Sequence, residues 1–228
     1  MKSKKNNLLI VAAHPDDEII GCGGTILKLK KNYNIEAIFM TDGISSRYKK
    51  NTPRKKIKNR REECLRVFKY LKIKKPTFCN FPDNQMDKVP LIEIVKVLEK
   101  KINKFKPNTI MTHFENCLNI DHRLTYQAVI TAARPLKNSS VKKILSFEVP
   151  SSTDWALFSK KNFQPNYFVD ISIYIKKKIH ALKLYKSELK KYPHSRSIKN
   201  IKSLAQIRGT SCGVNYAEGF VMSRYIEK

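Results

Sequence analysis

A short apolar run that ends in a cluster of acidic residues constrains the fold of this chain more than any other feature. Residues 8–13 (LLIVAA) are continuously apolar, which is typical of a strand buried on both faces of a parallel sheet. The run is followed at once by His14, Asp16, Asp17 and Glu18. Because ligands of open α/β sheets bind at the carboxyl ends of the strands, the cluster is predicted to lie where such a fold places its chemistry.

The residue types in this cluster favour a site for a divalent metal. Imidazole and carboxylate groups are good ligands for such ions, and for zinc above all. His14 and Asp17 are three positions apart, so a tight turn would aim both at one point and leave Asp16 free to take a proton from water.

Two other interpretations of the cluster remain open. Asp16 or Asp17 could cap a helix, with Glu18 in its first turn, but capping accounts for neither three acids in a row nor the histidine. Residues 21–24 (GCGG) could form a phosphate-binding loop, although they lack the G-x-G-x-x-G spacing of a dinucleotide site.

Apolar runs alternate with amphipathic stretches along the rest of the chain. At 228 residues the default is one domain, covering residues 1–228, and the pattern predicts a three-layer α/β domain with a mostly parallel sheet. Further strands are expected at residues 35–40, 77–81, 109–112, 144–149 and 168–173. Helices are expected at residues 24–31, 53–72, 90–105, 123–133, 176–190 and 197–208.

A second polar cluster, Asn119, Asp121 and His122, follows the strand predicted at 109–112. Asp121 fits the N-cap of the helix predicted at 123–133, and His122 would face the carboxyl edge of the sheet. A histidine at the start of a helix is usually a surface residue, but beside the first cluster His122 is the best third metal ligand. The predicted ligands are therefore His14, Asp17 and His122.

The sequence resembles the PIG-L/LmbE family of zinc-dependent N-acetyl-sugar deacetylases. The resemblance extends from about Leu8 to Arg224 and is carried by AHPDDE (13–18), FPDN (81–84), TH (112–113), NIDHR (119–123) and YPHSRS (192–197). It implies an LmbE-like, Rossmann-like fold, bound zinc with ferrous iron as the alternative, and hydrolysis of an acetamide to acetate and a free amino sugar.

The resemblance also implies roles for single residues. Asp16 would be the general base. Substrate contacts are expected near Asp42, Arg47 and Asp83, although Asp42 and Asp83 are equally compatible with plain turns. Asn119 stands where many members have a histidine, so it can hydrogen-bond a substrate but cannot transfer a proton. The general acid would then be Asp16 itself or His194.

The NIDHR form is most similar to family members that serve surface-polysaccharide or glycolipid synthesis. The expected substrate is therefore a sugar of the N-acetylglucosamine type, linked to a nucleotide or lipid carrier. The alternative is the precursor of a thiol cofactor, of the GlcNAc-malate or GlcNAc-inositol type.

The chain carries a formal net charge of +27, with lysine spread evenly along it. This spread favours a solvated lysine surface, with an anionic substrate carrier or peripheral contact with an anionic membrane as alternatives. A nucleic-acid-binding protein, the alternative from another class, would interleave aromatic residues with its basic patch, and the densest lysine stretches lack them. No specific nucleic acid is expected, and an oligomer is compatible with the sequence.

Five scattered cysteines without a C-x-x-C pair are typical of a reduced protein in the cytoplasm. The first apolar run is too short for a signal peptide, and no run approaches the ~20 residues of a membrane span. We expect a cytoplasmic protein, free or at the inner face of the membrane.

Two further features allow two interpretations each. The charges of residues 60–66 match the family's helix start, but in isolation they indicate ion pairing on a helix face. Trp155, the only tryptophan, would either stack on a sugar or pack in the core.

Overall fold

One sheet of seven strands forms the centre of the molecule in a computed structural model, which describes residues 5–48, 54–157 and 162–227. The strand order is β3-β2-β1-β4-β5-β7-β6. β1 to β5 pair in parallel, and β7 pairs antiparallel with both β5 and β6. The strands are β1 (Asn6–Ala12), β2 (Tyr33–Thr41), β3 (Thr77–Phe81), β4 (Thr109–His113), β5 (Lys143–Phe147), β6 (Tyr167–Asp170) and β7 (Ala217–Tyr225).

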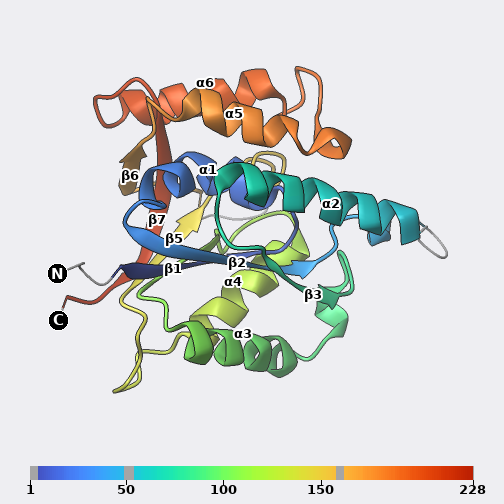
Figure 1. Cartoon of the computed structure of the whole chain (residues 1–228), viewed down its shortest axis with the longest axis vertical. Coiled ribbons are helices and arrows are strands. Elements are labelled where there is room, and N and C mark those ends of the chain that lie inside the picture. Colours follow the sequence, from blue (N-terminus) through green and yellow to red (C-terminus); the bar gives the residue numbers. More distant parts are fainter. Residues whose placement is uncertain (1–4, 49–53, 158–161, 228) are drawn as a thin grey trace.

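Helices cover both faces of the sheet, so the predicted α/β class with three layers is confirmed (Figure 1). One side carries α1 (Asp17–Leu29), α2 (Arg54–Leu71), α5 (Ile175–Lys183) and α6 (Ile198–Thr210), and the other carries α3 (Leu91–Phe105) and α4 (Ile120–Ala132). Among the described residues, none of the helices has the length and apolar character needed to cross a membrane.

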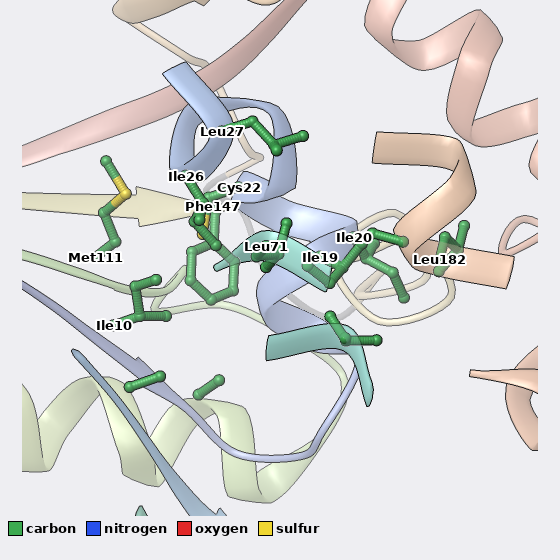
Figure 2. Close-up of a cluster of buried hydrophobic side chains, with 14 of the residues drawn as sticks. Ile10, Ile19, Ile20, Cys22, Ile26, Leu27, Leu71, Met111, Phe147 and Leu182 are labelled. Atoms are coloured by element: carbon green, nitrogen blue, oxygen red, sulfur yellow. The ribbon is translucent and has the colours of Figure 1, made fainter. Parts of the chain in front are cut away.

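Each face of the sheet has its own apolar core. On the α3 side, Ile94, Val95, Leu98 and Ile102 are buried at the helical spacing that predicts an amphipathic helix. On the other side, apolar residues of α1, α2 and α5 pack against those of the strands (Figure 2). The strand β1 is buried from both sides, which accounts for its uninterrupted apolar sequence.

The strand order reverses between β1 and β4. β1 pairs with β2 on one side and with β4 on the other, so the two halves of the sheet diverge at this point. Such a switch point opens a crevice at the carboxyl ends of the two strands. His14 follows β1 and His113 ends β4, and both are therefore placed at this crevice.

The glycines after the acidic cluster do not form a phosphate loop. α1 begins at Asp17, earlier than the predicted residue 24, so residues 21–24 lie inside the helix. A Cβ added at Gly21 would lie 2.3 Å from Cδ2 of Phe147, and one at Gly24 would lie 2.6 Å from Cγ2 of Ile171. The glycines therefore allow the helix to pack closely on its neighbours.

Two other predicted helices have different limits. The helix predicted at 123–133 begins at Ile120, and its N-cap is Asn119 rather than Asp121. The helix predicted at 176–190 ends at Lys183, because the chain turns through Leu184 into a short 3-10 helix at Lys186–Glu188. The predicted start of α2 at residue 53 lies outside the described residues.

Candidate metal centre and active site

His14, Asp17 and His122 come together at the crevice, and all three are buried. His14 Nδ1 lies 3.1 Å from Asp17 Oδ2 and 3.2 Å from His122 Nε2. His122 Nε2 in turn lies 3.3 Å from Asp17 Oδ2. Residues more than a hundred positions apart thus direct three possible ligand atoms at one point.

This triangle fits a divalent ion. Zinc bonds of about 2.0–2.1 Å in tetrahedral geometry separate neighbouring ligands by about 3.3 Å, close to the three distances above. Two histidines and one carboxylate are also a ligand set found in catalytic zinc sites. The oxygen of Asp17 in this triangle is Oδ2, and its other oxygen, Oδ1, lies 4.0 Å from Arg196 Nη2.

The other nitrogen of His14 faces two further carboxylates. His14 Nε2 lies 3.2 Å from Asp121 Oδ2 and 3.4 Å from Asp83 Oδ1, and these three residues form a second possible ligand group. The carboxylate of Asp121 already accepts the backbone N–H groups of Asn84, at 2.7 Å, and Met86, at 3.2 Å. We therefore assign Asp121 to orienting His14, as carboxylates behind metal-bound histidines do, rather than to the metal itself.

The charge states of the ligands follow from this arrangement. Burial alone would lower the pKa of His14, but its hydrogen bonds to Asp121, Asp17 and Asp83 outweigh burial and raise that pKa well above its usual value. Burial would raise the pKa of Asp17, but His122 and His14 hold it well below its usual range. Asp17 is therefore a carboxylate in the folded chain.

Asp16 lies beside the ligands with one oxygen held and one free. Its Oδ2 is 3.3 Å from Arg60 Nη2 and 3.3 Å from Arg196 Nη1, whereas the buried Oδ1 has no hydrogen-bond partner among the described residues. Burial raises the pKa of Asp16 to about 6, against the opposing charges of Arg60 and Arg196. The geometry leaves one oxygen available to accept a proton.

The backbone at Asp16 adopts an unusual conformation. Its φ of 114° lies in a region that residues other than glycine rarely occupy. The Asp16 N–H donates to Oε2 of Glu18, at 2.9 Å, and Tyr185 donates to the other oxygen of Glu18, at 2.5 Å. Glu18 therefore stabilises the turn that carries the ligands, and it does not face the metal position.

The helix-face pairing expected for Arg60 is wrong. Arg60 is 2% exposed and donates to the carbonyl oxygen of Pro15, besides its contact with Asp16. Its Nη1 lies 3.3 Å from Glu188, which Arg47 also contacts, at 2.8 Å. The charge of Arg60 is therefore directed at Asp16 and Glu188 beside the crevice. The sequence does not show this role, because it depends on where α2 packs in the fold.

His113 is a site residue for which the sequence assigned no role. Its Nε2 accepts the N–H of Ala13 at 2.8 Å, and its ring stacks on His122 with the centroids 3.8 Å apart. Burial lowers the pKa of His113 well below its usual value, so the ring is neutral. His113 joins the end of β4 to the end of β1, and the sequence signals for it were its position at a strand end and the TH motif at 112–113.

Comparison with known proteins places this geometry in a family. The model of the family PIG-L, described as GlcNAc-PI de-N-acetylase, matches residues 9–133, which is more than half of the chain. The chain belongs to the PIG-L family. The matched residues include both clusters that border the crevice.

Individual relatives extend the likeness beyond that segment. An uncharacterized deacetylase of Escherichia coli K12, YaiS, is 29% identical over 81% of this chain and 93% of its own length. The diacetylchitobiose deacetylase of Thermococcus kodakarensis is 28% identical over 93% of this chain and 81% of its own length. The structure of N,N'-diacetylchitobiose deacetylase from Pyrococcus horikoshii shares the fold with a TM-score of 0.77, at 24% identity, covering 96% of this chain and 84% of that one.

The four residues predicted to contact the substrate differ in burial and in hydrogen-bond partners. Asp83 is buried against His14, with Oδ2 accepting the N–H of Ser46 at 2.9 Å. Asp42 Oδ1 accepts two backbone N–H groups of its own turn, which matches the turn interpretation. The Asn119 side chain caps α4 and donates to Asn84 at 2.7 Å, and the Arg47 side chain is 47% exposed beside its partner Glu188.

His194, the second predicted catalytic residue, lies on the loop before α6. Its Nδ1 accepts the N–H of Arg196 at 3.0 Å, and its ring centroid is 5.6 Å from that of Trp155. Through Arg196 the loop reaches Asp16 and therefore the predicted metal ligands. Trp155 is 48% exposed, so the core-packing interpretation of this tryptophan is wrong.

Proposed function

We propose that this PIG-L protein is a metal-dependent N-deacetylase that hydrolyses the acetamide of an N-acetylglucosamine-type sugar. The deacetylase relatives and the family support this class of reaction. One observation carries the proposal: the buried Asp16 leaves Oδ1 free beside the ligand set of His14, Asp17 and His122. A base next to a metal position is what water-mediated amide hydrolysis requires.

Three ligands would hold zinc, with ferrous iron as the alternative. The ion would supply Lewis-acid activation of water and of the amide carbonyl. Asp16 Oδ1 would accept the proton of the attacking water, while Arg60 and Arg196 hold its Oδ2 and fix the orientation of the carboxylate. Water adds to the acetyl carbon, the C–N bond breaks, and the products are acetate and the free amine.

The leaving amine needs a proton from a general acid. Asp16 can return the proton that it accepted, because its Oδ1 has no hydrogen-bond partner among the described residues that would hold the proton. His194 is the alternative: as an imidazolium it would donate a proton to the amine and become neutral, and its Nδ1, which accepts the N–H of Arg196 in this structure, would give up that hydrogen bond while the ring is charged. Asn119 cannot fill this role, and its amide is engaged by α4 and Asn84.

The same proposal covers substrate and location. Asp42, Arg47, Asp83 and Asn119 would border the sugar, and the half-exposed Arg47 would face an anionic carrier of nucleotide or lipid type. A precursor of a thiol cofactor remains the alternative substrate. The whole chain, residues 1–228, would act as one domain in the cytoplasm, free or at an anionic membrane surface, in surface-polysaccharide or glycolipid synthesis.

Release of acetate tests the proposed reaction directly. The zinc-loaded and iron-loaded chain is incubated with free N-acetylated mono- and disaccharides, with nucleotide-linked and lipid-linked N-acetyl sugars, and with GlcNAc-malate and GlcNAc-inositol. We expect acetate and a free amine in equal amounts from at least one of them. The matched control is His122→Ala, which should lose both metal and activity. No acetate from any of these sugars with either metal would refute the proposal.

A further inference from the structure

Trp155 and His194, which we call the aromatic pair, expose a large ring surface beside the metal ligands. Their ring planes are tilted by 58°. Trp155 is 48% exposed, although buried tryptophan contributes strongly to a core. The ring is therefore available for a ligand.

The loop that carries Trp155 also contacts a predicted metal ligand. Ser152, three residues earlier, places its Oγ 3.3 Å from Nδ1 of His122. Its carbonyl oxygen and its Oγ accept the backbone N–H groups of Leu118 and Asn119, so the loop is tied to the segment before α4. Trp155 is thus held at the edge of the crevice and not on a distant surface.

The loop that carries His194 reaches the general base. Arg196 lies 3.3 Å from Asp16 and donates through Nε to Ser151 Oγ, at 2.7 Å. One side chain therefore joins both loops of the aromatic pair to the base. A ligand that touches the pair would be continuous with one whose acetamide lies near Asp16.

Two other residues of the His194 loop carry hydroxyl groups. Ser195, next to His194 in the chain, has a buried Oγ with no hydrogen-bond partner among the described residues. Tyr192 is 62% exposed on the same loop. An exposed aromatic face on a loop that carries hydroxyl groups suits a sugar ring, which has an apolar C–H face and a hydroxyl-bearing edge.

We propose that the aromatic pair binds a second sugar ring, attached directly to the N-acetyl sugar that is hydrolysed. The inference rests on the proposed deacetylase function and narrows its substrate to N-acetylated disaccharides or longer saccharides. A nucleotide at this position would bring phosphates, yet the guanidinium of Arg196 beside the pair is already engaged by Asp16 and Ser151.

Tryptophan fluorescence can report the binding of a ligand at Trp155, because this is the only tryptophan of the chain. The full-length Asp16→Asn protein is loaded with zinc and titrated with N-acetylglucosamine, N,N'-diacetylchitobiose and UDP-N-acetylglucosamine. The substitution slows hydrolysis, so that binding can be followed before the sugars are consumed. We expect the disaccharide to change the tryptophan emission at a roughly tenfold lower concentration than the monosaccharide, as one aromatic stacking contact allows. Equal half-saturation for both, no change with the disaccharide, or tighter binding of the nucleotide sugar would overturn the proposal.

Comparing kcat/KM for a disaccharide and a monosaccharide tests the second-ring proposal separately from the deacetylase function. Trp155→Ala should lower the ratio of kcat/KM for the disaccharide to kcat/KM for the monosaccharide about tenfold, mainly through KM, and Trp155→Phe should restore most of it. Ile207→Ala, which truncates a residue on α6 that is 57% exposed, is the control and should keep the wild-type ratio.

The two proposals fail differently. Acetate release with an unchanged ratio in Trp155→Ala would overturn the second-ring proposal alone. A disaccharide-specific change in emission without acetate release from any sugar would refute the deacetylase function and leave the binding of the second ring supported.

Discussion

Asp16 and Arg60 form a buried ion pair that occupies only one oxygen of the carboxylate. Arg60 Nη2 lies 3.3 Å from Asp16 Oδ2, and both side chains are 1% exposed. Arg196 shares the same oxygen, so Oδ1 remains without a hydrogen-bond partner among the described residues. The arrangement keeps the carboxylate in place and leaves it able to accept a proton.

Replacing the base should separate catalysis from metal binding. Asp16→Asn keeps the size of the side chain but cannot take the proton of water. We expect it to retain the metal and to lose roughly 10²–10⁴-fold in kcat. Elemental analysis and acetate release on one protein sample measure both properties. Near wild-type turnover in this variant would contradict the assigned role.

A second pair of measurements addresses the identity of the acid. If His194 is the general acid, His194→Ala lowers kcat and removes the alkaline limb of the pH–rate profile. If Asp16 performs both steps, that limb persists and the rate falls little.

Asp121 should influence the metal without binding it. The carboxylate of Asp121 lies 3.2 Å from His14 Nε2, and Asp121→Asn replaces it with an uncharged amide. Because such carboxylates orient the imidazole and raise its basicity, we expect metal affinity to fall about 10–100-fold with the fold retained. Competition with a chelator measures the affinity, and Asp87→Asn, at an exposed position nearby, is the control. Complete loss of metal would instead indicate that Asp121 is a ligand.

Gly24 should resist substitution because of packing. A Cβ there would approach three side-chain atoms of Ile171 at 2.6–2.8 Å. Overpacking of this kind costs about 1–3 kcal/mol, which outweighs the better helix propensity of alanine. Gly23→Ala, whose Cβ would come no closer than 3.2 Å to Ile19, is the matched variant and should cost less. Urea unfolding gives both values, and a stable Gly24→Ala protein would argue against close packing.

Glu36 should make stability depend on pH. Burial would raise its pKa, but ion pairs with Lys101 and Lys74, both at 2.8 Å, outweigh burial and lower it. A lowered pKa in the folded state stabilises the protein above the unfolded-state pKa of about 4.3, and this stabilisation is lost as the pH falls through the folded value.

The variant Glu36→Gln isolates this contribution. We expect the wild type to exceed Glu36→Gln by about 0.5–1 kcal/mol in the free energy of unfolding at pH 7, since the pair is near the surface. The difference should shrink as the pH falls below about 4. Urea unfolding across this pH range measures it, and a difference independent of pH would contradict the assignment.

Several strands and helices, and the edge of the sheet that carries the site, could be predicted because they depend on local patterns in the sequence. The apolar run before His14 predicted a strand buried on both faces, and β1 is such a strand. The helix predicted at residues 90–105 is α3, with Ile94, Val95 and Leu98 buried on one face. Polar residues directly after two strands predicted where a site would lie, because parallel strands bring their carboxyl ends to one edge.

Other features depended on contacts between segments that are distant in the chain. Arg60 was compatible with a helix-face ion pair until the packing of α2 buried it against Asp16. Asn119 rather than Asp121 became the helix cap, since the carboxylate of Asp121 is taken up by His14, Asn84 and Met86.

The sequence by itself determined the fold class, the family and the residue types of the site, because apolar periodicity and the AHPDDE motif are local properties of the chain. The tertiary structure decided which oxygen of Asp16 stays free, which nitrogen of His14 faces Asp17, and that Trp155 is exposed. These outcomes depend on which partners from other segments of the chain, such as Arg60, Arg196 and Asp121, the fold brings within reach. No local pattern encodes that competition.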